Sequence, residues 1–380
     1  MFAFVRLTAV FLLLAGFASA QQQDLLLRVL LSEGAVGTLS IGAHDRVNGA
    51  GSQTMAGGSF RLSAGQGQVL VDGQAAGNWV EFAAPEGFTL SGRAFRGNLM
   101  AVSQGGRLLF INRVWLEDYL LGVVPSEVPV NFPDAVLQAQ SILARTFALY
   151  RLNPQGLYDL CATERCQVYK GREVETPRHS SAVIATRGLI VSYDAQPITA
   201  VYSADSGGFT ASSGEVWGTD KPYLTARPDP FSQSPGGTWT VSISPAAVAR
   251  ELGELSLSVG TVRSMQVLAY SASGRPSSLR VNGSSRSVTL NAVQASRVLR
   301  GIGLRSTRVE IRGLSATGWG NGHGVGMSQW GARGLASQGW DFRQILGYYY
   351  PGTFLSSFEV VAGLRTKLYS MGFGRVIAGR

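Results

Sequence analysis

Short runs of alternating apolar and polar residues fill the segment from residue 24 to residue 112, and they narrow the folds that this chain can adopt. LLLRVLL, GQVLVDG and NLMAVSQGGRLLFIN are typical runs, separated by Gly, Asn, Asp and Ser turns. A period of two places the apolar side chains on one face of a strand. We therefore expect a β-rich segment.

The pattern changes at Val114, and the clearest helix is predicted over NFPDAVLQAQSILARTFALYRL, with Asn131 and Pro133 suited to its start. Its apolar positions recur at helical spacing and form one stripe: Val136, Ala139, Leu143, Phe147 and Tyr150. The opposite face is polar, and we expect it to be solvated unless it serves a site: Asp134, Gln138, Ser141 and Arg145.

Strand patterns return over residues 182–226 around a Ser-Gly-Gly loop, and residues 238–312 combine strand and helix patterns. A short amphipathic helix is predicted over DFRQILGYYY. With 380 residues and 45% hydrophobic content, the chain can bury a substantial core in two or three domains. The expected fold class is α+β, with a strand-rich N-terminal segment followed by a mixed α/β domain.

The first residues have the pattern of an export signal. Arg6 precedes a short apolar run, and Ala18, Ser19 and Ala20 supply the small residues of a cleavage site. A membrane anchor is the competing interpretation, but the run is short for a bilayer-spanning helix of roughly 20 residues. We expect residues 1–20 to be a signal peptide, and the mature protein to reach the periplasm or cell wall without a stable membrane anchor.

Basic residues outnumber acidic ones, with 33 Lys and Arg against 24 Asp and Glu and a net charge of +9. Such a chain is attracted to anionic surfaces. The arginines are scattered and form no basic stripe or nucleic-acid motif, so we expect no nucleic-acid partner. An envelope polymer is the better partner, although the charge could also serve solubility alone.

Cys161 and Cys166, in DLCATERCQVYKG, are the only cysteines of the sequence. An exported chain with an even count most often pairs them, and closing so short a loop would gain about 2 kcal/mol. Structural zinc is the alternative, because the two thiolates and His179 would supply three of the usual four ligands. Both interpretations stay open on these residues alone.

One carboxylate stands out in PSEVP, residues 125–129, where two prolines flank Glu127. Proline fixes its own φ and biases the residue before it away from helix. We therefore expect a stiff loop that restricts the Glu127 side chain. Such a mount suits a general acid, whereas a carboxylate in a loop is more often simply solvated.

Several blocks, in the same order and with similar spacing, resemble the stage II sporulation protein D family, SpoIID/LytB. They are LEDYLLGVVPSEVP, AQSILARTFAL, CQVYKG, AVIATRGLIVSY, YSADSGGFTASSGEVWG, PYL, GHGVGMSQWGA and YYYPGT. The resemblance covers about residues 90–355. It implies a catalytic domain over 113–355 with a substrate cleft, after a β-rich segment over 21–112 and before a tail over 356–380. Within that domain, residues 238–312 are expected to be an insertion or subdomain.

The resemblance implies a lytic transglycosylase that cleaves peptidoglycan glycan strands, preferably strands stripped of stem peptides. Glu127 matches the family's catalytic acid, and Arg145 matches an arginine implicated in the substrate site. Gln138 stands where the family usually has a lysine, which removes one positive contact to the glycan. Members that bind zinc use a histidine upstream of the cysteine pair, and RLNPQGLYDL contains none. We therefore expect a disulfide and no metal cofactor.

The motif GWGNGHGVGMSQWG places His323 among glycines, which let a backbone turn tightly and approach a ligand closely. The resemblance puts this motif beside Glu127, where His323 would bond a sugar or, as readily, lock the glycine loop to the core. The other residues expected to line the cleft, or alternatively to pack or cap a helix, are Tyr202, Ser206, Gly207, Gly208, Trp217, Ser328 and Gln329.

A lone carboxylate suits the implied chemistry. Most glycosidases use two carboxylates, but here the sugar's own C6 hydroxyl closes on C1 and gives a 1,6-anhydro product without water. Glu127 would need a raised pKa, for which four nearby valines could provide an apolar site: Val123, Val124, Val128 and Val130. Two alternatives remain. One is a non-catalytic wall-binding protein that enhances an amidase, and the other is a glycosidase with Asp205 or Glu215 as its second carboxylate.

Overall fold

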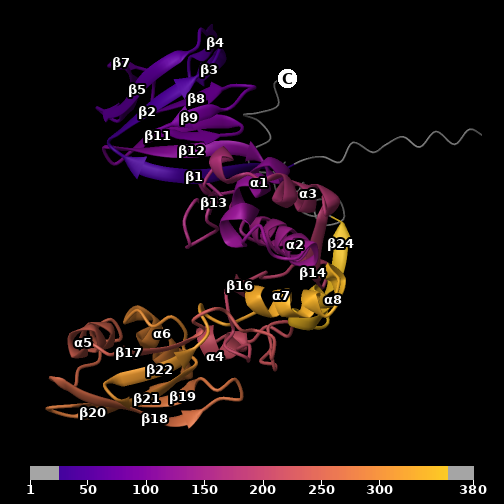
Figure 1. The fold of residues 1–380 in the computed structure, drawn as a ribbon. Coiled ribbons are helices and arrows are strands. Elements are labelled where there is room, and N and C mark those ends of the chain that lie inside the picture. Colours follow the sequence, from indigo (N-terminus) through magenta and orange to yellow (C-terminus); the bar gives the residue numbers. More distant parts are fainter. Residues whose placement is uncertain (1–24, 358–380) are drawn as a thin grey trace, which may run out of the picture.

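Two sheets from the N-terminal part of the chain pack face to face at one end of the molecule (Figure 1). The computed structural model describes residues 25–357, so the predicted signal peptide and most of the predicted tail lie outside the described residues. β2 shows the expected alternation, with exposed and buried residues in strict turn. The core of these sheets is apolar and draws on both of them.

The first sheet has seven strands in the order β13 (Leu160–Cys161), β1 (Leu26–Gly34), β12 (Arg107–Trp115), β11 (Asn98–Gln104), β8 (Trp79–Ala83), β3 (His44–Asn48) and β4 (Gly51–Met55). The second has six, in the order β10 (Arg93–Phe95), β9 (Phe88–Leu90), β2 (Val36–Ile41), β5 (Gly58–Gly65), β6 (Gln68–Val71) and β7 (Gln74–Ala75). The β-rich N-terminal region expected from the alternating sequence is therefore confirmed.

Helices fill the middle of the molecule. They are α1 (Leu116–Glu127), α2 (Asp134–Tyr150), α3 (Pro177–Ala185), α7 (Gln329–Ser337) and α8 (Phe342–Tyr349), with the short helices η1 (Arg172–Val174) and α4 (Ser213–Trp217). A small sheet lies against them, in the order β15 (Gln196–Pro197), β14 (Leu189–Tyr193) and β24 (Phe354–Ser357). Both helices predicted from periodicity, α2 and α8, are confirmed.

α2 is buried on nearly every side, because α1, α3, α7, α8 and β14 all contact it. The expectation that its polar face is solvated is wrong for Ser141 and Arg145, which are both fully buried. The apolar stripe is also less uniform than expected, since Phe147 is half-buried and Tyr150 is exposed. α2 is therefore the centre of the helical region and not a surface helix.

A third region, residues 238–319, lies at the opposite end of the molecule from the N-terminal sheets (Figure 1). We call it the 238–319 unit. Its sheet has the order β17 (Thr238–Ser242), β22 (Ser315–Trp319), β21 (Val309–Gly313), β18 (Val262–Tyr270), β19 (Pro276–Gly283) and β20 (Ser287–Asn291). The helices α5 (Pro245–Gly253) and α6 (Ala292–Gly301) share a separate apolar core with this sheet.

A two-residue parallel pairing joins distant parts of the chain beside the helices. β16 (Tyr202–Ser203) pairs with β23 (Met327–Ser328), and Tyr202 is opposite Met327. This pairing brings the segment that follows β14 next to the glycine-rich segment that precedes α7. None of the helices within residues 25–357 combines the length and the apolar character that a bilayer-spanning helix requires. The fold class is α+β, as predicted.

Candidate active site

Glu127 is the last residue of α1, and the prediction that it lies in a loop is wrong. The helix continues through Pro125 and ends two residues later. Val128 then turns to extended backbone, with φ −130° and ψ 140°, as expected for a residue that precedes a proline. Pro129 therefore sets where the helix stops, and the helix itself fixes the backbone of Glu127.

Buried His179 holds the residue that follows Glu127. Its Nε2 lies 3.0 Å from the carbonyl oxygen of Val128, and its Nδ1 lies 2.8 Å from Oγ1 of Thr176. Because a carbonyl can only accept, Nε2 carries the proton and Nδ1 accepts from the threonine hydroxyl. Both ring nitrogens of His179 are thus engaged at the end of α1.

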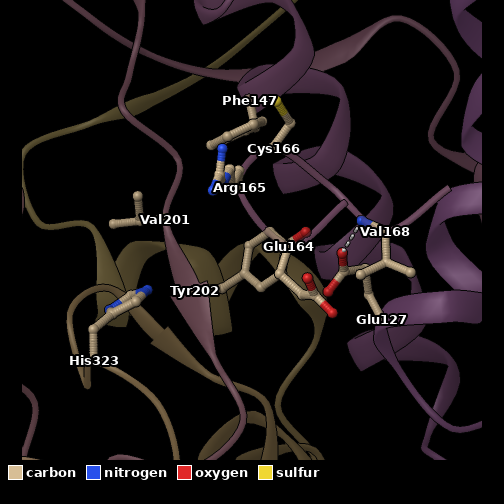
Figure 2. Close-up of a pocket in the computed structure, with 9 residues that line it drawn as sticks. All are labelled: Glu127, Phe147, Glu164, Arg165, Cys166, Val168, Val201, Tyr202 and His323. Carbon is tan, nitrogen blue, oxygen red and sulfur yellow. Dashed lines mark hydrogen bonds between the residues drawn. The ribbon is translucent and has the colours of Figure 1, made fainter. Parts of the chain in front are cut away.

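The Glu127 carboxyl opens into a cavity of about 300 Å³, with side chains from several segments around it (Figure 2). The lining residues are Glu127, Phe147, Glu164, Arg165, Cys166, Val168, Val201, Tyr202 and His323. Of the four valines expected to surround Glu127, Val123 and Val124 instead belong to the core next to the N-terminal sheets, and Val130 is exposed. The apolar part of the cavity wall comes from α2, the CQVYKG segment and the segment that carries Tyr202.

Two hydrogen-bond donors approach the Glu127 carboxyl. The backbone N–H of Val168 donates to Oε1 at 3.2 Å, and the hydroxyl of Tyr202 provides a side-chain hydrogen bond. Buried Gln167 orients that hydroxyl, because its Nε2 donates to the Tyr202 oxygen at 3.3 Å while its Oε1 accepts from the Tyr119 hydroxyl at 3.3 Å. A phenol oxygen that accepts from Gln167 keeps its own proton for the carboxyl.

The pKa of Glu127 is raised, and burial is the largest cause. The hydrogen bonds from Val168 and Tyr202 favour the ionised form and lower this pKa, the charge of Glu164 raises it, and the charge of Lys170 lowers it. Burial prevails because desolvation penalises the charged carboxylate. Glu127 therefore keeps its proton to a higher pH than a free glutamate does, as a general acid requires.

A second carboxylate, that of Glu164, lines the same cavity, and the sequence analysis did not single it out. It lies in the short loop between Cys161 and Cys166, which are joined by a disulfide with their Cα atoms 5.4 Å apart. Cys161 also lies in β13, which pairs with β1 and so ties one end of the loop to the first sheet. The disulfide thus restricts the loop that carries Glu164 and Arg165 next to Glu127 (Figure 2).

His323 lies on the opposite side of the cavity from Glu127 (Figure 2). Its Nδ1 accepts the backbone N–H of Val325 at 3.0 Å, and its ring lies 5.2 Å from the ring of half-exposed Trp217. Burial lowers the pKa of His323 to about 3, and the charges of Arg300 and Arg275 add to the effect. The imidazole is therefore neutral, with a proton on Nε2 that it shares with the backbone of Tyr202, and it ties its glycine-rich loop to that segment.

The structure corrects the role expected for Arg145. Its side chain is fully buried and grips Glu117, with Nε–Oε1 at 2.7 Å and Nη2–Oε2 at 2.8 Å. It also donates to the carbonyl oxygens of Leu189, at 3.0 Å, and Val183, at 3.3 Å. A guanidinium without exposed surface cannot contact a glycan. The ion pair with Glu117 on α1 therefore explains why an arginine occupies this position, and a contact with substrate does not.

Several other expected glycan contacts lie outside the lining of this cavity among the described residues: Gln138, Ser206, Gly207, Gly208, Trp217, Ser328 and Gln329. Ser328 is buried and caps α7 by accepting the N–H of Gly331, and buried Gln329 donates to Gln140. Buried Ser206 donates its hydroxyl to Asp229. These three residues serve the packing of the helical region.

The carboxylates that the sequence offered as partners for Glu127 are used elsewhere. Asp205 is buried and accepts hydrogen bonds from the hydroxyls of Ser232 and Ser234. Glu215 closes the capping box of α4 by accepting the backbone N–H of Ser212 at 3.1 Å. The structure therefore offers Glu164, and neither Asp205 nor Glu215, as the second carboxylate of the cavity.

The alternative zinc site is not assembled. The disulfide occupies both thiols, and His179 is committed to Val128 and Thr176. Within residues 25–357, no cluster of three or more His, Cys, Asp or Glu side chains is placed to hold a metal ion. The residues present thus do not fit the zinc group that the alternative required.

Comparison with known proteins identifies the family of the chain. The family model described as "Stage II sporulation protein" matches residues 104–193, which include Glu127 and the disulfide loop. An uncharacterized protein of Brachyspira hyodysenteriae is 31% identical over 72% of this chain and 75% of its own length. The amidase enhancer of Bacillus subtilis is 29% identical over 63% of this chain but only 40% of its own length. Stage II sporulation protein D of Bacillus subtilis is 30% identical over 65% of this chain and 76% of its own length. The chain belongs to the stage II sporulation protein D family.

Proposed function

We propose that this protein is a lytic transglycosylase that cleaves the glycan strands of peptidoglycan, preferably strands stripped of stem peptides. One observation carries the proposal: a carboxyl with a raised pKa, Glu127, ends a helix at the wall of a cavity between distant chain segments. Membership of the stage II sporulation protein D family supports a cell-wall substrate. The net charge of +9 suits an anionic wall polymer.

The reaction needs one group that first gives and then accepts a proton. Protonated Glu127 donates to the glycosidic oxygen as the bond from C1 breaks. The carboxylate that remains accepts the proton of the C6 hydroxyl as that oxygen closes on C1. The product is a 1,6-anhydro sugar, and Glu127 ends the cycle protonated, so the proton balance closes on one side chain.

Tyr202 and Val168 fit the second half of this cycle. Both donate to the carboxyl, so they stabilise Glu127 at the moment when it carries a negative charge. Gln167 keeps the Tyr202 hydroxyl oriented toward that carboxyl. Neutral His323, on the other side of the cavity, uses Nδ1 on Val325 and its ring N–H on the backbone of Tyr202, so it holds the glycine-rich loop against the segment that carries Tyr202.

Export and domain organisation are part of the same proposal. We place the protein in the periplasm or cell wall, with residues 1–20 as a signal peptide that lies outside the described residues. The proposed catalytic domain spans residues 113–355, with residues 238–312 as a subdomain, between a β-rich segment at 21–112 and a tail at 356–380.

Product analysis tests this function directly. Purified protein is incubated with peptide-free glycan strands, and the new ends are examined by mass spectrometry. The expected products end in 1,6-anhydro sugars. Reducing ends would mean that water attacks instead, with Glu164 as the carboxylate that activates it. Intact strands after long incubation would remove the enzymatic proposal altogether.

A second candidate is a non-catalytic wall-binding protein that enhances an amidase, with an amidase as its partner. The observation that favours it is the 29% identity to the amidase enhancer of Bacillus subtilis. Amidase turnover on whole wall, measured with and without this protein, distinguishes the two functions when Glu127→Gln is included. An enhancer keeps its effect in that variant, whereas an effect that depends on strand cleavage is lost.

A further inference from the structure

The sheet of the 238–319 unit opens into a cleft of about 710 Å³ between two of its central strands. β18 pairs with β21 only where Met265 and Gln266 are opposite Gly313 and Arg312. Beyond that point, two irregularities in the pairing of β18 with β19 interrupt its register, while β21 continues beside β22 as far as Val309. The two strands diverge, and the cleft is the space between them.

The backbone of β21 contributes to this cleft. Among the described strands, residues Val309 to Ile311 pair with β22 on one side and have no ladder partner on the β18 side. Val309 and Ile311 point into the core shared with α5 and α6, and both are buried. Because side chains alternate along a strand, the side chains of Arg308, Glu310 and Arg312 lie on the opposite face, which the helices do not cover.

The uncovered face carries aromatic rings and arginines. Tyr270 is 48% exposed, and the side chain of Arg312 is 90% exposed. Half-buried Trp319 lies 5.9 Å from the guanidinium of Arg308, which also donates to the carbonyl oxygen of Gly207. This contact uses one of the five N–H donors of Arg308 and fixes the guanidinium beside the ring. Glu310, the one acidic lining residue, lies 3.9 Å from Nη2 of Arg312 in a loose, exposed ion pair, and with Arg308 the cleft keeps an excess of one positive charge.

We infer that this cleft is a second binding site, separate from the Glu127 cavity, for an acidic saccharide. Aromatic rings stack on the apolar face of a sugar, arginine forks bind carboxylates in a bidentate manner, and unpaired strand backbone bonds hydroxyl groups. A carboxylated sugar uses all three features at once. A peptide added to the free edge of β21 would use the backbone alone. The choice of a wall glycan as the natural ligand rests on the proposed function.

The chain connects this cleft with the Glu127 cavity. Trp319 ends β22, and the glycine-rich segment that follows it leads to His323 on the cavity wall. Gly207, which accepts from Arg308, is packed against the backbone of Trp319. One glycan strand held in the cleft would therefore be retained close to the helical region that carries Glu127, which increases its local concentration there.

The test uses the full chain with Glu127→Gln, so that no strand is consumed, and two tetrasaccharide probes. One alternates N-acetylglucosamine with N-acetylmuramic acid, and the other is chitotetraose, which lacks the carboxylates. The indole N–H signal of Trp319 reports the cleft by NMR, and that of Trp217, whose ring packs against cavity-lining His323, reports the cavity. We expect the acidic probe to shift the Trp319 signal and to bind the cleft at least ten-fold more tightly than chitotetraose does.

Two cleft variants and one control complete the test. Arg312→Gln and Tyr270→Ala should each weaken cleft binding by about ten-fold, because they remove a charge-assisted contact and a stacking surface. Arg297→Gln removes one exposed charge from α6, on the helical side of the sheet, and should leave the affinity of the cleft for both probes unchanged.

Equal binding of both probes, or cleft binding unaffected by both cleft variants, would overturn the inference. Occupation of the β21 edge by an extended peptide, with no response to either saccharide, would overturn it too. A shift at Trp319 without strand cleavage by the wild type would leave the inference standing and sink the proposed function.

Discussion

α1 carries a glutamate near each end, and the two side chains have opposite surroundings. Glu117, in the first turn, lies against the buried guanidinium of Arg145, which binds both of its carboxylate oxygens. Glu127, the last residue, opens into a cavity and meets a backbone N–H, a phenol and a second carboxylate. One residue type therefore forms a structural ion pair at one end and a candidate proton donor at the other.

The helix itself adds to this difference. The N-terminal end of a helix has a partial positive charge that stabilises an anion, and the C-terminal end has a partial negative charge that disfavours one. The helix therefore stabilises the ionised form of Glu117 at its start and the protonated, neutral form of Glu127 at its end. Position along the helix and the partners that other segments supply at each end therefore decide what each carboxyl does.

The largest expected effect separates the two ends by activity. Glu127→Gln keeps the size of the side chain but removes the proton that it must give and accept, so strand cleavage should fall by about 10²- to 10⁴-fold. Binding of strands and the unfolding midpoint should stay near wild type, because the amide still fits the cavity. Cleavage rates on peptide-free strands give the measurement. A near-normal rate would end the distinction between the two glutamates.

At the Glu117 end of α1, the main expected effect of a substitution is a loss of stability and not a loss of activity. Arg145→Ala leaves Glu117 as an unpaired, largely buried carboxylate, and breaking a buried pair in this way costs about 3–5 kcal/mol of unfolding free energy. Urea unfolding checks this value, with Arg343→Ala, from the exposed pair with Asp341, as a control expected to cost less than about 1 kcal/mol. An Arg145→Ala variant of full stability that has lost glycan binding would return Arg145 to the substrate site.

A smaller loss is expected when the disulfide loop beside Glu127 is released. The double substitution Cys161→Ser and Cys166→Ser opens a loop of only a few residues, which should cost about 2 kcal/mol of unfolding free energy. Thiol titration of the denatured, unreduced wild type should find no free thiol. The Glu117 end of α1 has no such loop against it, so any change in activity of the double variant concerns the Glu127 end.

The smallest expected effect is a shift of the pH profile. The proposed cleavage requires protonated Glu127, so kcat/KM should fall as pH rises through the raised pKa of that group. Glu164→Gln removes a negative charge that raises this pKa, and the fall should then begin at lower pH. Glu173→Gln, in η1, serves as a control for the loss of one carboxylate outside the cavity. A shift toward higher pH in the Glu164 variant would contradict the electrostatic role assigned to Glu164.

The sequence allowed the prediction of elements whose signal is local. α2 and α8 follow from apolar spacing, and the N-terminal strands follow from alternation. Glu127 could be chosen as the candidate acid because two prolines flank it and a family motif includes it. Its position on a helix could not, since the bias of proline against helix was outweighed by the packing of α1 against α2.

Contacts between distant segments were beyond a single sequence. Arg145 has the spacing of a solvated residue on α2, and only the approach of α1 shows that Glu117 buries it. Glu164 has no motif of its own, and its nearness to Glu127 depends on how β13 and the disulfide fold the loop back. Its position between the two cysteines was the one available signal, because a disulfide-closed loop has few accessible conformations.

The parallel pairing of β16 with β23 can form only late in the synthesis of the chain, because its two strands lie far apart in the sequence. Tyr202 meets Met327, and α8 covers α2, only after most of the chain has been made. At 5–20 residues per second, α2 waits on the order of 10 to 40 s for α8 to be translated. During that time the side of α2 that α7 and α8 contact lacks its native cover, and the wall of the Glu127 cavity lacks His323. Any interruption of synthesis before β23 therefore yields a product without a complete cavity.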